Sequence, residues 1–405
     1  MDRNIKTYYI RQFFHNLWFI VPVLVSFYND LGLTFGQVLL LQSISAISAI
    51  VFSVPSGLLA DRIGRKKVLL LGIFLLNLFM FFYLFVTNFF EFIILDIVFG
   101  ASLALISAEF PLVSDTLMEN DSEEKTTEVF SNGNTILILS FMASNIALIF
   151  LISYGYRFTI LCSLLAFIIG FFIALVGYKE PRLKKKETEE PRSFRFHLRK
   201  MNEYCRKDHF LFYLIIIGAI YLSISYLVFW FVQPYFAESN LPIESFGLLY
   251  AIINTTELVA TNLSYRIEKK IGKKATILII NLLFMFAFLG MSFIFNIFGI
   301  IFVILRQIGS AFAVPIFNAY ISEEITYMEK LEGEDIPSSK ATIYSVYAML
   351  NNLIFSVISP IMGFLADNIS LSFTLLLLFL TLSISLIFNL ILLSRLKIKN
   401  SNKFT

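Results

Sequence analysis

Charge is scarce in this 405-residue chain, since only 15% of its residues are Asp, Glu, Lys or Arg, against roughly 25% in a typical soluble domain. Hydrophobic residues make up 58% of the chain, and the mean hydropathy is +0.78. A soluble globule of this size exposes a large share of its residues and could not hide so much apolar surface. The composition therefore predicts a polytopic membrane protein.

Cysteine is equally rare. The two cysteines, Cys162 and Cys205, make no disulfide framework and fit no metal spacing. No G-x-x-x-x-G-K-[ST] loop occurs, so ATP drive is not expected, and the H-E-x-x-H and G-x-S-x-G motifs of hydrolases are also missing. The net charge of +3 is too small to indicate nucleic-acid binding. We expect no enzyme, no cofactor, no metal and no nucleic-acid partner.

Long apolar runs fill the chain instead. A helix that crosses the bilayer core needs about 20 mainly apolar residues. Twelve such stretches lie between charge clusters and turn residues, near 9–28, 34–58, 67–87, 90–116, 131–153, 157–178, 210–236, 245–264, 275–295, 297–321, 341–365 and 371–394. The predicted fold class is an all-α polytopic membrane protein with twelve transmembrane helices.

The cations test this count, because cytoplasmic loops carry an excess of Lys and Arg. With the N-terminus inside, Arg3, Lys6 and Arg11 lie in the cytosol, and all but two of the 32 Lys and Arg residues fall in inside segments. The exceptions are Arg157, at an outside turn, and Arg306, within a span. We therefore predict that both termini are cytosolic.

The chain also repeats itself. Trp18 and Pro22 in the first predicted span recur as Trp230 and Pro234 in the seventh, and the turn that follows the second span recurs after the eighth. Matches in the same order predict two parallel, pseudo-symmetric six-helix halves, 1–178 and 209–405, joined by a cytosolic linker, 179–208. Parallel repeats of this kind surround a substrate site near the bilayer midplane.

The turn after the second span carries the most specific motif. Residues 57–67 read G-L-L-A-D-R-I-G-R-K-K and match G-x-L-x-D-R-x-G-R-K, the signature loop of the major facilitator superfamily. The chain resembles this superfamily over essentially its whole length, which implies the two-half fold and secondary transport by alternating access. A cluster of cations that serves topology alone would explain the charges, but not Gly57, Asp61 and Gly64 at their spacing.

In that family the loop latches the two halves on the cytosolic side. The loop Asp faces a helix of the second half, and the second Arg pairs with an acid near the end of the fourth span, which implies roles for Asp61, Arg65 and Asp115. We expect Gly64 to adopt a positive φ or to allow close backbone approach. The whole predicted latch comprises Gly57, Asp61, Arg62, Gly64, Arg65, Lys66 and Asp115.

Shorter matches resemble a branch of proton-driven drug exporters from Gram-positive bacteria. They are Pro22, Pro55-Ser56-Gly57, Gln233-Pro234 and residues 341–345. This resemblance implies the bacterial plasma membrane, a small amphipathic substrate, protons as the coupling ion and a monomer. The leading interpretation is export in exchange for protons. Alternatives are an uptake carrier or facilitator, a membrane-embedded enzyme and a sensor.

Ionisable residues within spans are costly and usually functional. Asp96 and Arg306 occupy equivalent positions in the two halves, and we predict that both face the central cavity and bias substrate or proton binding. The alternative is a structural ion pair between the halves. Glu109 could serve a gate or a proton, or could simply lie at the membrane interface. On a regular helix it would not share a face with Asp96 unless Pro111 distorts the span.

Five further residues complete the candidates in or near the predicted cavity. Glu257 is either a proton site or a packing partner of a neighbouring asparagine, and His15 is either a hydrogen-bonded polar residue or a proton carrier. Gln233, Trp18 and Trp230 lie on the first and seventh spans. For the tryptophans, anchoring at the membrane interface is the alternative.

Overall fold

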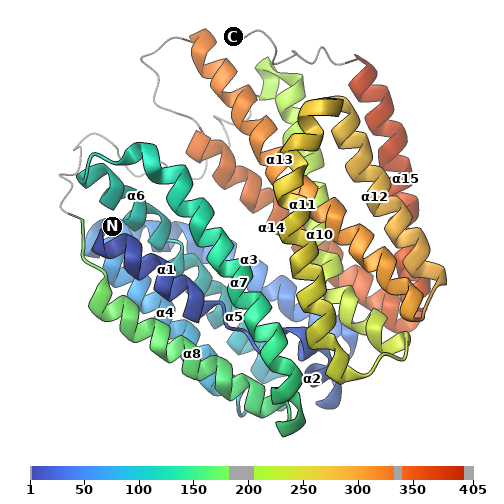
Figure 1. Cartoon of the computed structure of the whole chain (residues 1–405), viewed down its shortest axis with the longest axis horizontal. Helices are drawn as coiled ribbons and strands as arrows, with labels where there is room; N and C mark the ends of the chain where they lie inside the picture. Colours follow the sequence, from blue (N-terminus) through green and yellow to red (C-terminus); the bar gives the residue numbers. More distant parts are fainter. Residues whose placement is uncertain (1, 182–204, 333–339, 396–405) are drawn as a thin grey trace. The chain divides into compact units, whose positions relative to one another are not determined.

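The computed structural model describes residues 2–181, 205–332 and 340–395, and within these ranges it contains helices and turns but no strand (Figure 1). The α-helices are α1 (Arg3–His15), α2 (Leu24–Asp30), α3 (Phe35–Ile63), α4 (Arg65–Tyr83), α5 (Phe89–Ile106), α6 (Glu109–Glu119), α7 (Thr126–Leu151), α8 (Tyr156–Gly177), α10 (His209–Glu238), α11 (Phe246–Ile271), α12 (Lys273–Phe293), α13 (Ile300–Glu332), α14 (Lys340–Asn368) and α15 (Leu371–Arg395). The predicted all-α polytopic fold is confirmed.

Every predicted span coincides with one helix or with a broken pair. Among the described residues, ten helical stretches are long and apolar enough to cross a membrane. The first predicted span does not reach that length, because it is divided into α1, a 3-10 turn (Val21–Val23) and α2, with Pro22 at the turn. The eighth span, α11, is long enough but contains the polar residues Asn254 and Glu257.

The helices form two compact units. One contains α1 to α8 together with Leu241–Asn254 and Ser359–Phe364, and the other contains the remaining parts of α10 to α15. The first unit is therefore larger than the predicted half 1–178. Within it, the hydroxyl groups of Ser43 and Ser359 are 2.7 Å apart. Of the predicted linker, residues 182–204 lie outside the described residues.

In the first unit, α3 packs tightly on α5 through small residues. The hydroxyl of Ser48 donates to the carbonyl of Ile97 at 2.7 Å. A Cβ added at Gly100 would lie 2.3 Å from the carbonyl oxygen of Ser45, so only glycine fits there. This close approach brings polar groups of α3 against the middle of the fourth predicted span.

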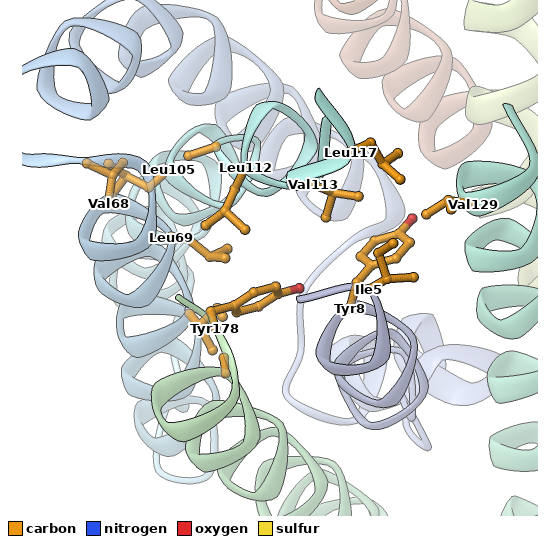
Figure 2. Close-up of a cluster of buried hydrophobic side chains, with 13 residues drawn as sticks. Ile5, Tyr8, Val68, Leu69, Leu105, Leu112, Val113, Leu117, Val129 and Tyr178 are labelled. Atoms are coloured by element: carbon orange, nitrogen blue, oxygen red, sulfur yellow. The ribbon is translucent and has the colours of Figure 1, made fainter. Parts of the chain in front are cut away.

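A buried apolar cluster joins α1, α4, α5, α6, α7 and the residue that follows α8 (Figure 2). Its fully buried members include Val68 and Leu69 of α4 and Leu112 and Val113 of α6. In Figure 2, Tyr178 extends from the end of α8 toward α1. Because the cluster holds these helix ends together, it fixes the positions of the polar groups around it.

The second unit has a buried polar network around Tyr221 of α10. Its hydroxyl accepts hydrogen bonds from the amide of Asn281 on α12 and, at 3.1 Å, from that of Asn389 on α15. The ring stacks on Phe284 and Phe317. Paired polar groups within an apolar interior bring specific helices together, since leaving them unpaired is costly.

Candidate functional site

The signature loop is a sharp turn between two helices. α3 ends at Ile63, α4 begins at Arg65, and Gly64 between them has a φ of 99°. Residues with a Cβ rarely adopt this backbone region. A Cβ at Gly64 would also lie 3.0 Å from the carboxyl carbon of Glu180. Both the turn and the approach of Glu180 therefore require glycine.

Glu180 caps the first turn of α4. Its carboxylate accepts the backbone N–H of Arg65 at 2.7 Å and that of Lys66 at 2.8 Å. The first N–H groups of a helix lack partners in the helix and form the positive end of its dipole, so an anion fits there. Just before it, the side chain of Asn4 exchanges two hydrogen bonds with the backbone of Lys179, at 2.9 and 2.8 Å. The start of the predicted linker is thus fixed to both α1 and the signature loop.

The structure brings Arg65 and Asp115 together. The two side chains form an ion pair, and the Arg65 guanidinium also donates to the carbonyl of Pro111 at 2.6 Å. Both side chains are partly exposed, so the pair contributes little stability. It does join the start of α4 to α6, and its role as a latch remains a prediction.

The rest of the motif lies on the exposed side of α3. Asp61 and Arg62 are exposed in its last turns. A cation such as Arg62 is favourable there, because the helix C-terminus is the negative end of the dipole. Nothing lies within 4 Å of a Cβ added at Gly57. The described residues therefore give no steric reason for glycine at that position.

The fourth predicted span is two helices. α5 ends at Ile106, Ser107 and Ala108 form a turn, and α6 begins at Glu109. Pro111 is the third residue of α6, where its missing N–H breaks no helical hydrogen bond. The span is therefore not one regular helix, and its two acids contact different helices, Glu109 contacting α1 and Asp96 contacting α3.

Glu109 is the centre of a buried polar cluster. The guanidinium of Arg11 on α1 forms an ion pair with its carboxylate, and the hydroxyl of Tyr178 donates to the same carboxylate. Arg11 is 1% exposed and Glu109 5%. The cluster holds α1, α6 and the end of α8 together. Arg11 is therefore a buried, paired charge, and its place among the cytosolic cations stays a prediction.

Asp96 lies on α5 and is 3% exposed. One carboxylate oxygen accepts the hydroxyl of Ser45 on α3 at 2.5 Å, while the other has no hydrogen-bond partner among the described residues. A buried carboxylate with a single neutral donor is costly as an anion, because the lost hydration is not replaced. Of the two buried acids that the structure describes in the first unit, Asp96 and Glu109, Asp96 has the weaker compensation.

In the second unit, Glu257 of α11 accepts a hydrogen bond from the amide of Gln307 on α13 at 2.8 Å. Arg306, next along α13, is buried and lies close enough to attract the Glu257 carboxylate. Glu257 thus has Gln307 as a hydrogen-bond partner, Asn262 bonds to the carbonyl of Leu258, and the packing of Glu257 on Asn254 stays a prediction. Arg306 and Asp96 each have a partner in their own unit, and the predicted pairing between them remains a prediction.

The aromatic candidates are packed. Trp18 lies edge-on to Phe99 and Phe167, and its indole N–H donates to the carbonyl of His15 at 3.1 Å. His15 stacks on Phe167 at 5.4 Å, so it acts first as a packing residue. Trp230 is buried on α10, and its N–H has no hydrogen-bond partner among the described residues. Gln233, one turn further on, is also buried.

Sequence reasoning did not identify several partners of these residues. Each one was visible only as a polar side chain in or beside an apolar run: Arg11, Ser45, Tyr178, Glu180 and Gln307. Arg11 and Gln307 carried the clearest signal, because both interrupt predicted spans. Among the described residues, no group of three His, Cys, Asp or Glu could hold a metal ion.

Known proteins resemble this chain in both sequence and structure. Residues 13–357 match the profile of the family described as Major Facilitator Superfamily. The uncharacterized MFS-type transporter YxaM of Bacillus subtilis is 24% identical over 359 residues, which cover 84% of this chain and 85% of YxaM. The quinolone resistance protein NorA of Staphylococcus aureus is 33% identical, but over 79 residues only, 19% of this chain and 20% of NorA.

Among solved structures, the nucleoside transporter NupG superposes with a TM-score of 0.73. The match covers 96% of this chain and 99% of NupG at 14% sequence identity. At this sequence identity, the match shows a shared fold and says nothing of the function.

Proposed function

Because the chain belongs to the major facilitator superfamily, it is a membrane transporter and not an enzyme, and we propose that it exports small amphipathic molecules in exchange for protons. The proposal includes alternating access, in which the substrate site opens to one side of the membrane at a time. It also includes the plasma membrane of a bacterium, with both chain termini in the cytosol.

The carboxylate of Asp96 carries the proposal of proton coupling. In this conformation it is buried, with one hydroxyl donor and one oxygen that meets no hydrogen-bond partner within residues 2–181, 205–332 and 340–395. Protonation removes the charge and with it the cost of burial. A conformation that exposes Asp96 to water favours its anion instead. The proton therefore binds one conformation better than the other, which is the condition for a ligand to shift a conformational equilibrium.

The other two acids predicted to lie in or near the cavity, Glu109 and the half-buried Glu257, are better compensated. Glu109 has the full charge of Arg11 beside it and a hydroxyl donor as well. Glu257 has the amide of Gln307 and lies near Arg306. A carboxylate that is paired in this way is stable as an anion, so protonation changes its energy less. Asp96 is the proton site that these contacts favour.

Two observations support the proposed substrate class. NorA is named for quinolone resistance, and its matched segment is short. The indole of Trp230 offers a buried aromatic face and an N–H that has no hydrogen-bond partner in the part of the chain that the structure describes. Such a group suits a ligand with both apolar and polar parts. This supports an amphipathic substrate and leaves its identity open to the assay.

Transport into proteoliposomes tests the proposal. A panel of dyes and antibiotics is supplied with the proton gradient imposed in either direction. An exporter that exchanges protons accumulates a substrate against its gradient on the proton-rich side. Asp96→Asn should abolish this accumulation but keep downhill exchange, while the exposed Asp30→Asn serves as the matched control. Accumulation by Asp96→Asn at the unaltered rate would overturn the proton site, and accumulation on the proton-poor side would indicate an uptake carrier instead.

A further inference from the structure

A groove about 530 Å³ in volume runs between α1 and α8 on the first unit. Its walls are almost entirely apolar, and they include Thr7 and Ile10 from α1 and Ile169, Phe172, Ile173 and Val176 from α8. The lining on α8, from Ile169 to Gly177, extends about 12 Å along the helix. The groove therefore offers an apolar surface for about two turns of α8.

The rim of this groove lies on the surface of the fold. Ile10 is 49% exposed, Phe172 57% and Val176 69%. In a membrane protein, such a surface faces hydrocarbon rather than water. At one end the two helices touch. A Cβ added at Gly177 would lie only 2.4 Å from the hydroxyl of Thr7, so the helices approach closely there. The groove is thus closed at the end where α1 begins and α8 stops.

Cations gather at that closed end. The guanidinium of Arg3 donates to the carbonyls of Val176 and Gly177, at 2.6 and 2.9 Å. Lys6 directly precedes Thr7 and is exposed, and no ion pair of Lys6 is found among the described residues. Lys179 follows two residues after Gly177 and is exposed as well.

The acids nearby are already used. The carboxylate of Asp2 caps α1 by accepting the N–H of Asn4, and its other oxygen accepts the amide of Asn120. The carboxylate of Glu180 caps α4. Neither acid forms an ion pair with Lys6 or Lys179 among the described residues, and the three cations together with these two acids leave a net charge of +1.

We propose that this groove binds one acyl chain of an anionic phospholipid, with the phosphate held by Lys6, Lys179 and Arg3. The apolar walls match a hydrocarbon chain, and the cations lie where the headgroup of that chain emerges. Basic pockets between transmembrane helices bind anionic headgroups by the same combination. A lipid seated here contacts both α1 and α8, beside the hydrogen bonds between Asn4 and Lys179.

Native mass spectrometry of the full chain in detergent micelles measures the binding directly. The probes are phosphatidylglycerol and phosphatidylcholine with identical acyl chains. We expect the wild type to retain phosphatidylglycerol preferentially. Lys6→Gln and Lys179→Gln should each lower its apparent affinity about fivefold, since one cation near an anionic surface is worth about that factor. Lys274→Gln, an exposed cation on α12, is the matched control.

Two further arms separate a lipid from a simpler ligand. Ile173→Trp fills the groove and should lower phosphatidylglycerol retention, whereas Leu165→Trp, at an exposed position on α8 that does not line the groove, should not. Glycerol phosphate, which lacks acyl chains, should not displace the lipid. Equal retention of the two lipids, displacement by glycerol phosphate, or no effect of either lysine variant or of Ile173→Trp would overturn the proposal.

Discussion

Arg11 donates to one oxygen of the Glu109 carboxylate, and Tyr178 donates to the other. The three residues come from α1, the start of α6 and the end of α8, so one carboxylate organises three separate segments. An ion pair excluded from water contributes modest net stability while it is intact. Removing only one of the two charges is costly, because the remaining charge stays buried without its partner.

The first prediction follows from this asymmetry. Arg11→Gln or Glu109→Gln should each lower the free energy of unfolding by about 3–5 kcal/mol, since each leaves one buried charge unpaired. The double variant should lose less than either single one. Tyr178→Phe, which removes a single hydrogen bond to a charged group, should cost about 1.5–3 kcal/mol. Thermal unfolding of the purified protein in detergent measures all four, and additive losses in the double variant would contradict the pairing.

The second prediction concerns the latch. Asp61→Asn and Arg65→Ala should abolish turnover while membrane insertion stays largely intact, because the inward- and outward-facing states differ by only a few kcal/mol. Arg65→Lys keeps the charge, but its shorter reach and single ammonium group must replace the one guanidinium nitrogen that contacts both Asp115 and the carbonyl of Pro111, so partial activity is expected. Initial transport rates, normalised to the protein in the membrane, give the result. Wild-type rates in the first two variants would refute the latch.

Glu180 provides a third prediction. Glu180→Ala removes the cap of α4, which is worth roughly a fivefold change in a conformational equilibrium. Glu180→Gln keeps one acceptor and should fall between the alanine variant and the wild type. Hydrogen exchange of the Arg65 and Lys66 amides should become faster in the same order. Glu123→Gln, an exposed acid between α6 and α7, controls for loss of charge alone. Unchanged exchange in Glu180→Ala would show that water replaces the cap without cost.

A double-mutant cycle tests the charges of the second unit. Because Arg306 lies near Glu257, we expect Glu257→Gln and Arg306→Gln to be non-additive by about 0.5–3 kcal/mol, the range for residues in contact. The same cycle with Asp96→Asn and Arg306→Gln examines the pair suggested by the repeat. Coupling in the second cycle but not the first would favour a pair between the halves. Thermal stability and proton-driven accumulation should be measured for each corner.

The last prediction is the topology. Single cysteines placed at Lys125 and at Asn240 should differ, with only the second labelled by a membrane-impermeant maleimide applied to intact cells. Cys162 must first be replaced. Cys205 gives little background at neutral pH, because it is buried and burial raises the pKa of its thiol to about 11. Since the thiolate is the form that reacts, a group with that pKa stays almost wholly protonated and unreactive. Labelling at position 125 from outside would reverse the predicted orientation.

The sequence predicted where the membrane spans lie, but it did not predict which side chains contact one another across the fold. The reason is physical. Apolar length and cation placement are properties of single segments, so α3 or α8 could be outlined from local composition. The contact between Arg11 and Glu109 joins positions 98 residues apart, and nothing local to either one specifies the other. The pairing of Arg65 with Asp115 was expected only because a family resemblance supplied it. The break in the fourth span at Ser107 was not predicted from the sequence, because no glycine marks that turn and Pro111 lies beyond it.

That break has a mechanical consequence. A continuous helix transmits any tilt along its whole length, so Asp96 would move whenever Asp115 does. The turn at Ser107 and Ala108 keeps its backbone hydrogen bonds, to Leu103 and Leu105, and its serine hydroxyl bonds to the carbonyl of Ala104. Bending at this point therefore exposes no unsatisfied backbone to the hydrocarbon. The arm of the fourth span that bears Asp115 can therefore tilt at Ser107 without forcing the same tilt on the arm that bears Asp96.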